Sequence, residues 1–215
     1  DRPTLDYVDY SVWEKDYLNS NEMKQAENYW VNKFKGTEIP SINLPYDYTS
    51  VSTHSYNGDQ INIKLPEELF NSLDNIAKEY NVSNYMLFLS MFYILLYKYT
   101  SQNNIIVGTP VENRNSVQLD NMIGMFVNNI VLNAIIDTNT NFADFLLDIK
   151  NMVLEALNYQ GYPYNMLVKN LSTNNNLFDV FFIYQNTYQE KVTLNNSPVE
   201  IIEANSHTAK YKLSL

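Results

Sequence analysis

Two histidines are the only side chains of this 215-residue chain with an ordinary pKa near neutrality, so they are the first candidates for acid–base chemistry. His54 lies in a segment rich in serine and threonine, and His207 lies between polar residues near the C-terminus. A general base needs a partner that orients it, and neither position offers one in the sequence. The chain has no cysteine, and no histidine is spaced for a metal site. The sequence therefore predicts no self-contained catalytic or metal centre.

A second set of chemically capable residues lies at the ends of apolar segments. These residues are Gly108, Thr109 and Pro110 after the segment 105–107, Asn128 within 126–136, and Gln185 with Asn186 after 178–184. Residues at the ends of buried strands face clefts more often than residues in the middle do. A buried amide must be paired. Each amide is therefore expected either to hold nearby backbone groups or to bind a ligand.

Composition narrows the classes of function. The formal net charge is −10 and the pI is about 4.6, so nucleic acid and anionic membrane surfaces are not expected partners. The apolar run over residues 85–97 is shorter than the roughly 20 residues that a membrane span needs. The N-terminus is polar and does not resemble a signal peptide. The absence of cysteine fits a reducing, cytoplasmic location.

The elements that would position these residues alternate between helices and strands. Periodicity predicts helices over 11–35, from Pro66 through residue 77, over 83–99, and from Asn141 to Gly161; it predicts strands over 60–65, 104–110, 126–136, 178–184, 199–204 and 211–215. Pro40 and Pro45 exclude regular helix from the segment 37–53. The expected fold class is α/β, with a mixed sheet packed against helices.

Several short motifs follow one another along nearly the whole chain. They are Tyr7-Val8-Asp9-Tyr10 with Trp13; Tyr29-Trp30 followed by Leu44-Pro45-Tyr46-Asp47; the run from Val107 to Arg114; the run from Ile123 to Asn128; Tyr162-Pro163-Tyr164 with Leu177 to Val180 and Gln185-Asn186; and the run from Ala209 to Leu215. In this order they resemble the condensation domains of non-ribosomal peptide synthetases.

The resemblance implies a fold and a reaction. The family has a chloramphenicol acetyltransferase-like fold in which two α/β lobes meet around a tunnel. An acceptor amine attacks a donor thioester, and both substrates arrive on 4′-phosphopantetheine arms of carrier proteins. The family's His-His-x-x-x-Asp-Gly motif belongs to its N-terminal lobe and has no counterpart in this chain. We therefore expect residues 1–215 to be a C-terminal lobe, incomplete at both ends and inactive alone.

The resemblance also suggests roles for the strand-end residues. Gly108, Thr109, Pro110, Asn128, Gln185 and Asn186 are expected to form a substrate-binding wall of the tunnel. Arg114 is expected to pair across the lobe interface, or else to make a local ion pair. No catalytic residue, directly bound cofactor or metal is expected. The expected partners are upstream and downstream carrier proteins, the N-terminal lobe and an adjacent adenylation domain.

Other functions remain open. An epimerisation domain is disfavoured by Gly124-Met125-Phe126-Val127-Asn128 and by Ile183-Tyr184-Gln185-Asn186, which are closer to the condensation pattern. A heterocyclisation domain is distinguished by the motif that lies outside the chain. A third alternative is a non-catalytic lobe that only docks carrier proteins.

Overall fold

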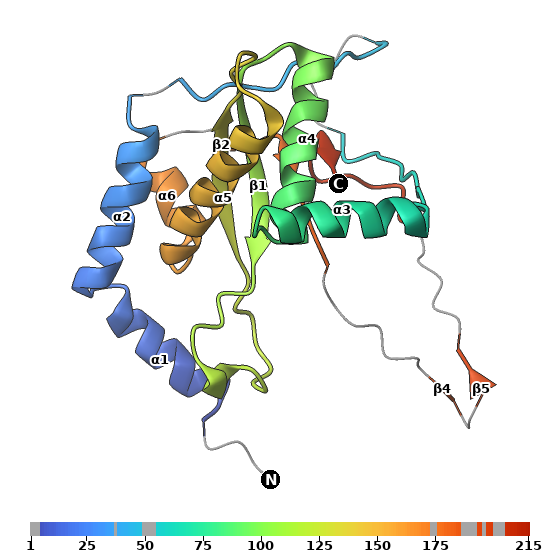
Figure 1. Cartoon of the computed structure of the whole chain (residues 1–215). Helices are drawn as coiled ribbons and strands as arrows, with labels where there is room; N and C mark the ends of the chain where they lie inside the picture. The colour runs from blue at the N-terminus through green and yellow to red at the C-terminus, as the bar shows by residue number, and fades with distance from the viewer. Residues whose placement is uncertain are drawn as a thin grey trace.

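The elements of the chain form one mixed sheet, its helices and a small separate hairpin (Figure 1). The computed structural model describes residues 5–36, 38–48, 55–172, 176–185, 193–194, 197–199 and 205–215. In chain order the elements are α1 (Tyr7–Tyr17), α2 (Asn21–Phe34), α3 (Glu67–Glu79), α4 (Asn84–Thr100), β1 (Asn104–Val111), a short 3-10 helix (Val117–Leu119), β2 (Asn128–Ile135), α5 (Phe142–Asn158), α6 (Tyr164–Asn170), β3 (Val180–Phe181), β4 (Thr193–Leu194), β5 (Ser197–Pro198) and β6 (Leu213–Ser214).

The main sheet has the strand order β2-β1-β3-β6. β1 pairs antiparallel with β2 and parallel with β3, and β3 pairs parallel with β6. β4 and β5 form a separate antiparallel pair. The expected α/β class with a mixed sheet is confirmed.

Helices α4 and α5 lie side by side over one face of the sheet (Figure 1). The middle of α4 is apolar around most of its circumference, as in a helix that is largely buried. Its Tyr93 is fully buried, and the Tyr93 hydroxyl donates to the Leu132 carbonyl of β2 at 2.8 Å. This hydrogen bond satisfies a polar group that would otherwise be stranded in the core.

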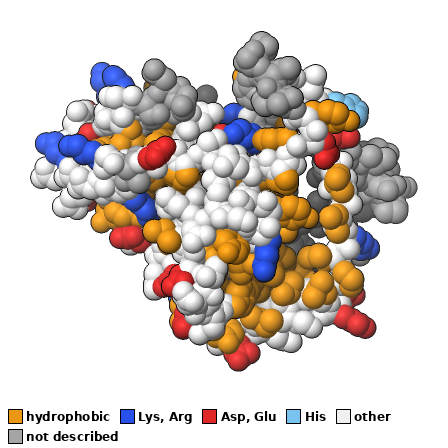
Figure 2. Space-filling model, turned by 90° about the horizontal axis from the view of Figure 1, so that it is seen from above, with side chains coloured by type: hydrophobic (Ala, Val, Ile, Leu, Met, Phe, Trp, Pro, Cys, Tyr) orange, Lys and Arg blue, Asp and Glu red, His pale blue; other side chains and the backbone are white. Residues whose placement is uncertain are grey.

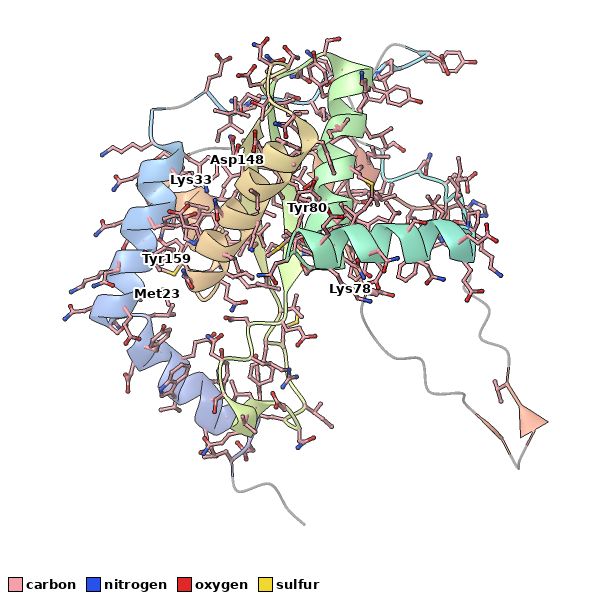
Figure 3. All side chains as sticks on the ribbon, in the orientation of Figure 1. Met23, Lys33, Lys78, Tyr80, Asp148 and Tyr159 are labelled. Carbon is pink, nitrogen blue, oxygen red and sulfur yellow. The ribbon has the colours of Figure 1, made fainter. Side chains whose placement is uncertain are left out.

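Helix α2 packs against α6 and the turn that follows α5. The indole Nε1 of Trp30 donates to the Tyr159 carbonyl at 2.9 Å. The ring of Tyr29 stacks on the ring of Tyr159, with centroids 4.3 Å apart. Figure 3 shows Tyr159 at the end of α5 that faces α2. The motif Tyr29-Trp30 therefore anchors α2 to the body of the fold.

Most helix starts follow the capping residues in the sequence. The side chains of Ser20, Ser83 and Asn141 accept from the backbone N–H groups three residues on, which satisfies donors that a helix leaves unpaired. The residues 11–35, predicted to be helical, lie in two helices, because the chain breaks after Tyr17 and restarts at the Ser20 cap. Gly36 ends α2 with a φ of +71°, a conformation that glycine adopts without strain.

The strand predicted over 60–65 is wrong, the strand predicted over 178–184 is shorter than expected, and one helix was missed. Residues 60–65 alternate as a strand would, but the structure assigns no strand to them, and Ile61 and Ile63 are 85% and 80% exposed. The short helix α6, which begins after Pro163, was not predicted. Only Val180 and Phe181 of the predicted strand 178–184 pair as β3, and residues 200–204 of another prediction lie outside the described residues.

Part of the apolar surface is open to solvent. Seen from above, hydrophobic side chains gather in one broad area, while charged side chains are scattered around it (Figure 2). No helix within the described ranges is long and apolar enough to cross a membrane.

Candidate functional site at one end of the sheet

The predicted site segments meet at one end of the main sheet. In the β1–β2 register Pro110 lies opposite Asn129, and Val111 lies opposite Asn128. β3 runs parallel to β1. On its other side β3 pairs with β6, and beyond the two strands the Ile183 N–H still donates to the Leu215 carbonyl. Three strand ends that are distant in sequence are therefore neighbours.

Gly108 is in close contact with an aromatic ring. A β-carbon at Gly108 would lie 2.4 Å from the ring of Phe178, so only glycine leaves room for this ring. The Phe178 ring in turn packs against Tyr164 and Tyr211. Gly108 thus allows a close approach by Phe178, and its expected contact with substrate stays a prediction. A glycine inside a β-branched strand signals such an approach, but the sequence does not identify the partner.

Thr109 points toward the other face of the sheet, where it is buried beneath α4. The Tyr85 hydroxyl of α4 donates to Thr109 Oγ1 at 3.1 Å. Burial raises the pKa of Tyr85 to about 12, so its hydroxyl keeps its proton at neutral pH. Sequence reasoning missed Tyr85, because no motif links it to Thr109.

The amide of Asn128 bonds to backbone groups of the turn between α5 and α6. Its Nδ2 donates to the carbonyls of Gln160 and Tyr162 at 2.8 and 2.7 Å, and its Oδ1 accepts from the Tyr164 N–H at 3.2 Å. Both amide hydrogens are thus used within the chain. The expected donation to a substrate stays a prediction that requires one of these bonds to break.

Arg114 lies inside the loop 112–127, which connects β1 to β2. Its guanidinium stacks over the ring of Phe126, with Cζ 4.2 Å from the centroid, and it donates to the Leu119 carbonyl. Phe126 also contacts Tyr10 of α1, with ring centroids 4.6 Å apart. Arg114 therefore braces the loop from within, and its expected role at a lobe interface stays a prediction.

The outer side of the loop is strongly apolar and exposed. Gly124 and Phe126 face α1, and a β-carbon at Gly124 would lie 2.2 Å from the ring of Tyr7. The alternate residues Ile123, Met125 and Val127 are 95%, 74% and 54% exposed, and we call them the apolar row. An extended segment of period two explains this division into an inner and an outer side.

The remaining candidates are less well defined. Gln185 is exposed, whereas Asn186 and His54 lie outside the described residues. His207 is exposed, and its Nδ1 lies 3.7 Å from Asp59 Oδ1. The described ranges hold no cluster of acidic residues and histidines suited to a metal ion.

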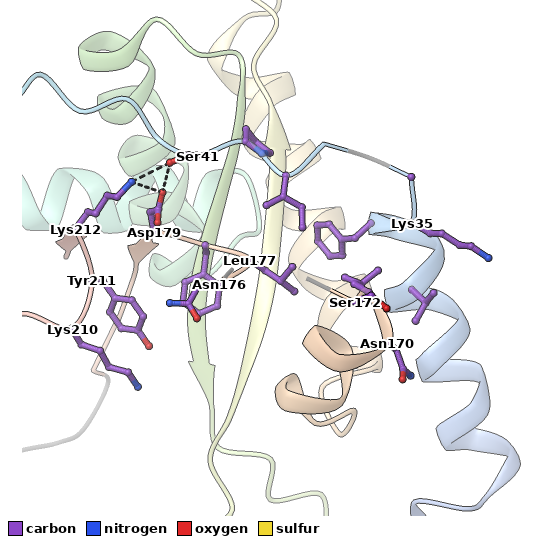
Figure 4. Close-up of a pocket in the computed structure, with 17 residues that line it drawn as sticks. Lys35, Ser41, Asn170, Ser172, Asn176, Leu177, Asp179, Lys210, Tyr211 and Lys212 are labelled. Carbon is purple, nitrogen blue, oxygen red and sulfur yellow. Dashed lines mark hydrogen bonds and ion pairs between the residues drawn. The ribbon is translucent and has the colours of Figure 1, made fainter. Parts of the chain in front are cut away.

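A hollow in the described structure lies elsewhere, at the opposite end of β3 and β6. It measures about 1160 Å³. Asp179, which precedes β3, accepts from Lys212 Nζ and from Ser41 Oγ, both at 2.8 Å (Figure 4). These polar groups satisfy one another and tie the segment 38–45 to the sheet. The second hollow, of about 400 Å³, lies beside the loop 112–127 and is lined by Glu112, Arg114, Asp120, Gly124, Phe126 and Val127.

The mixed sheet and its helical layer form an α/β fold of the chloramphenicol acetyltransferase-like kind. The family model described as "Condensation domain" matches residues 1–215, and the chain belongs to this family.

Curated relatives are large synthetases. The chain is 36% identical over 217 aligned residues to bacitracin synthase 3 of Bacillus licheniformis, covering 99% of this chain and 3% of that protein. It is 33% identical to surfactin synthase subunit 1 of Bacillus subtilis (strain 168), covering 98% of this chain and 6% of that protein. The chain thus spans a small fraction of these relatives.

Solved structures share the fold. The first condensation domain of the calcium-dependent antibiotic synthetase, solved with a substrate analogue, matches with a TM-score of 0.76 at 16% identity, covering 91% of this chain and 43% of that one. A four-domain non-ribosomal peptide synthetase, holo-AB3403 bound to AMP and glycine, matches with a TM-score of 0.73 at 25% identity, covering 79% of this chain and 13% of that one.

Proposed function

We propose that this chain is the C-terminal lobe of a condensation domain and forms one wall of the site at which a peptide synthetase makes an amide bond. In this reaction the acceptor's amine nitrogen attacks the donor's thioester carbonyl. A C–N bond forms, the C–S bond breaks, and the thiol of the donor's arm leaves with a proton. Family membership and the meeting of β1, β2 and β3 at one end of the sheet support the proposal.

The observation that carries the proposal is the convergence of strand ends beside the apolar row. Pro110 of β1, Asn128 of β2 and the residues that follow Phe181 of β3 come from three separate segments and lie at the same end of the sheet, where the loop 112–127 begins. An open wall of this kind needs a facing surface before water can be excluded from a reacting thioester. We assign the facing surface, and the histidine that moves the proton, to the N-terminal lobe.

The partners follow from the same proposal. The substrates are carried on the 4′-phosphopantetheine arms of an upstream and a downstream carrier protein, and this lobe itself binds no cofactor. An adenylation domain adjacent in the synthetase loads the acceptor. A cytoplasmic location is part of the proposal, and the absence of cysteine from the chain is compatible with it. In this role Gln185 and Asn186 are the residues proposed to contact the arms.

The apolar row supports the assignment of a facing lobe. Ile123 is 95% exposed and Met125 is 74% exposed, although both belong to a loop whose other side is well packed. Adjacent exposed apolar side chains of this size mark an interaction surface more often than random surface. The row lies at the end of the sheet where the facing lobe would close the site.

Amide formation by the complete domain tests the proposal. A donor carrier loaded with an acyl thioester is mixed with an acceptor carrier loaded with an amino acid, and mass spectrometry identifies the product on the acceptor. The proposal predicts acyl-aminoacyl acceptor only when the complete domain is present. Carrier binding, measured by calorimetry, without any amide product would instead favour a docking lobe.

A further inference from the structure

Asn128 occupies a special place at the base of the loop 112–127. It lies opposite Val111 in the β1–β2 register, where both strands run into the loop. Its amide bridges from this point to the turn 159–164, using two donors and one acceptor. The carbonyls and the N–H that it contacts lie at the end of one helix and the start of the next, where backbone groups lack helical partners. Asn128 therefore fastens the base of the loop to the turn.

The turn itself is held firmly by the rest of the fold. The Trp30 indole donates to the Tyr159 carbonyl at 2.9 Å, and Asn170 Nδ2 donates to the Tyr162 hydroxyl at 2.8 Å. Gly161 lies against the first residues of the loop, since a β-carbon there would lie 3.7 Å from Asn113 Oδ1. Through Asn128 the loop is connected to a body that includes α2, α5 and α6.

The far part of the loop has a separate attachment. The Tyr7 hydroxyl of α1 donates to the Met125 carbonyl at 2.8 Å, and Phe126 packs between Tyr7 and Tyr10. Two attachments, one at the base and one along the apolar row, fix the direction in which Ile123 and Met125 point. Loss of the Asn128 side-chain bonds would leave the loop held only by the β1–β2 ladder at its base and by α1 along the row.

We infer that Asn128 is a positioning residue: its amide holds the loop 112–127 in one orientation, so that the apolar row and the strand ends present a fixed wall. The inference rests on the proposed function, because the orientation of the wall matters only where the amide bond forms. Asn128 acts through the loop and needs no contact with the substrate.

The chain offers a matched control at the other end of the sheet. Gln102 is also an amide that bridges backbone groups, since its Nε2 donates to the Ser41 carbonyl at 3.0 Å and its Oε1 accepts from the Asn43 N–H at 2.8 Å. Gln102→Ala therefore removes a similar clamp that is far from the loop. If turnover fell only because the protein was less stable, Asn128→Ala and Gln102→Ala would lower it equally.

Hydrogen exchange and turnover, measured side by side, test the inference. In the 215-residue chain, Asn128→Ala is expected to raise exchange about tenfold or more in 112–127 and 160–164, with 105–109 unchanged, because only the local attachment is lost. In the complete domain it is expected to lower kcat about tenfold with KM for the carriers within about twofold. Gln102→Ala is expected to leave hydrogen exchange in 112–127 and 160–164 unchanged, and to leave kcat unchanged.

A milder variant distinguishes a local effect of the amide from misfolding of the whole chain. Asn128→Ser keeps one donor on a shorter side chain, and its exchange and kcat are expected to lie between those of wild type and Asn128→Ala. The inference is overturned if Asn128→Ala leaves exchange in 112–127 unchanged, or if Gln102→Ala lowers kcat equally. If the wild-type domain makes no amide, the proposed function fails, while the exchange data still decide whether Asn128 positions the loop.

Discussion

The ring of Phe178 fills the space that a side chain at Gly108 would need, with a β-carbon at Gly108 lying 2.4 Å from the ring. The ring is itself surrounded by Tyr164, Phe181 and Tyr211, so it has little freedom to move away. The glycine of the Gly108-Thr109-Pro110 motif thus has a packing role that is separate from any contact with substrate.

Gly108→Ala is expected to destabilise the chain by about 1–3 kcal/mol through overpacking, measured by urea denaturation. Gly161→Ala is the control, because its nearest contact would be 3.7 Å away, and it is expected to change stability by less than about 0.5 kcal/mol. If Gly108→Ala is as stable as wild type but the complete domain carrying it loses turnover, the glycine is needed for substrate contact and not for packing.

Asp179 makes stability depend on pH. Burial acts to raise the pKa of this carboxyl, but hydrogen bonds from Lys212 and Ser41 outweigh it and hold the pKa below the ordinary value of 3.8. The folded pKa is therefore lower than the unfolded one. The resulting stabilisation is present above the unfolded pKa and is lost as pH falls through the folded pKa.

Asp179→Asn is therefore expected to be less stable than wild type at pH 7, with the difference shrinking as the pH falls below about 4. Urea denaturation at several pH values from 7 down to 3 measures this difference. A difference that stays constant with pH would mean that the contacts of Asp179 do not depend on its charge.

Trp30 is expected to anchor α2 through one hydrogen bond as well as through its buried ring. Trp30→Phe keeps an aromatic ring but leaves the Tyr159 carbonyl without its donor, so it is expected to cost about 1–3 kcal/mol. Thermal unfolding by circular dichroism measures the loss. Trp13→Phe, at a half-exposed position on α1, is the comparison and is expected to cost much less.

The apolar row is expected to make the chain self-associate. Ile123→Ser with Met125→Ser removes two highly exposed apolar side chains without touching the packed side of the loop. Sedimentation is expected to show less association for this variant at equal stability. Equal self-association of wild type and this variant would place the associating surface elsewhere, for example at Ile61 and Ile63.

Patterns that depend on neighbouring residues were predicted well. The helix starts near Ser83 and Asn141, the strand β1 and the helix α5 follow from local signals, because capping and periodicity act within a few residues.

Features that depend on distant partners were not predicted. Residues 60–65 alternate like a strand, but a strand also depends on pairing with a distant neighbour, and the structure assigns no strand to this segment. The partners of Asn128 are backbone groups more than thirty residues away in sequence, so the sequence left open whether its amide holds backbone or binds a ligand. The contacts of Arg114 with Phe126 and of Gly108 with Phe178 likewise require the folded chain.

The most direct measurement for the central claim is single-turnover amide formation, comparing this chain alone with the same chain joined to its N-terminal lobe. Loaded donor and acceptor carriers are present in both reactions, and the product is quantified by mass spectrometry. We expect no product above background from residues 1–215 alone and amide product from the joined lobes. Amide formation by the chain alone, or its absence from the joined lobes with carriers fully loaded, would show that this chain is not a wall completed by an N-terminal lobe.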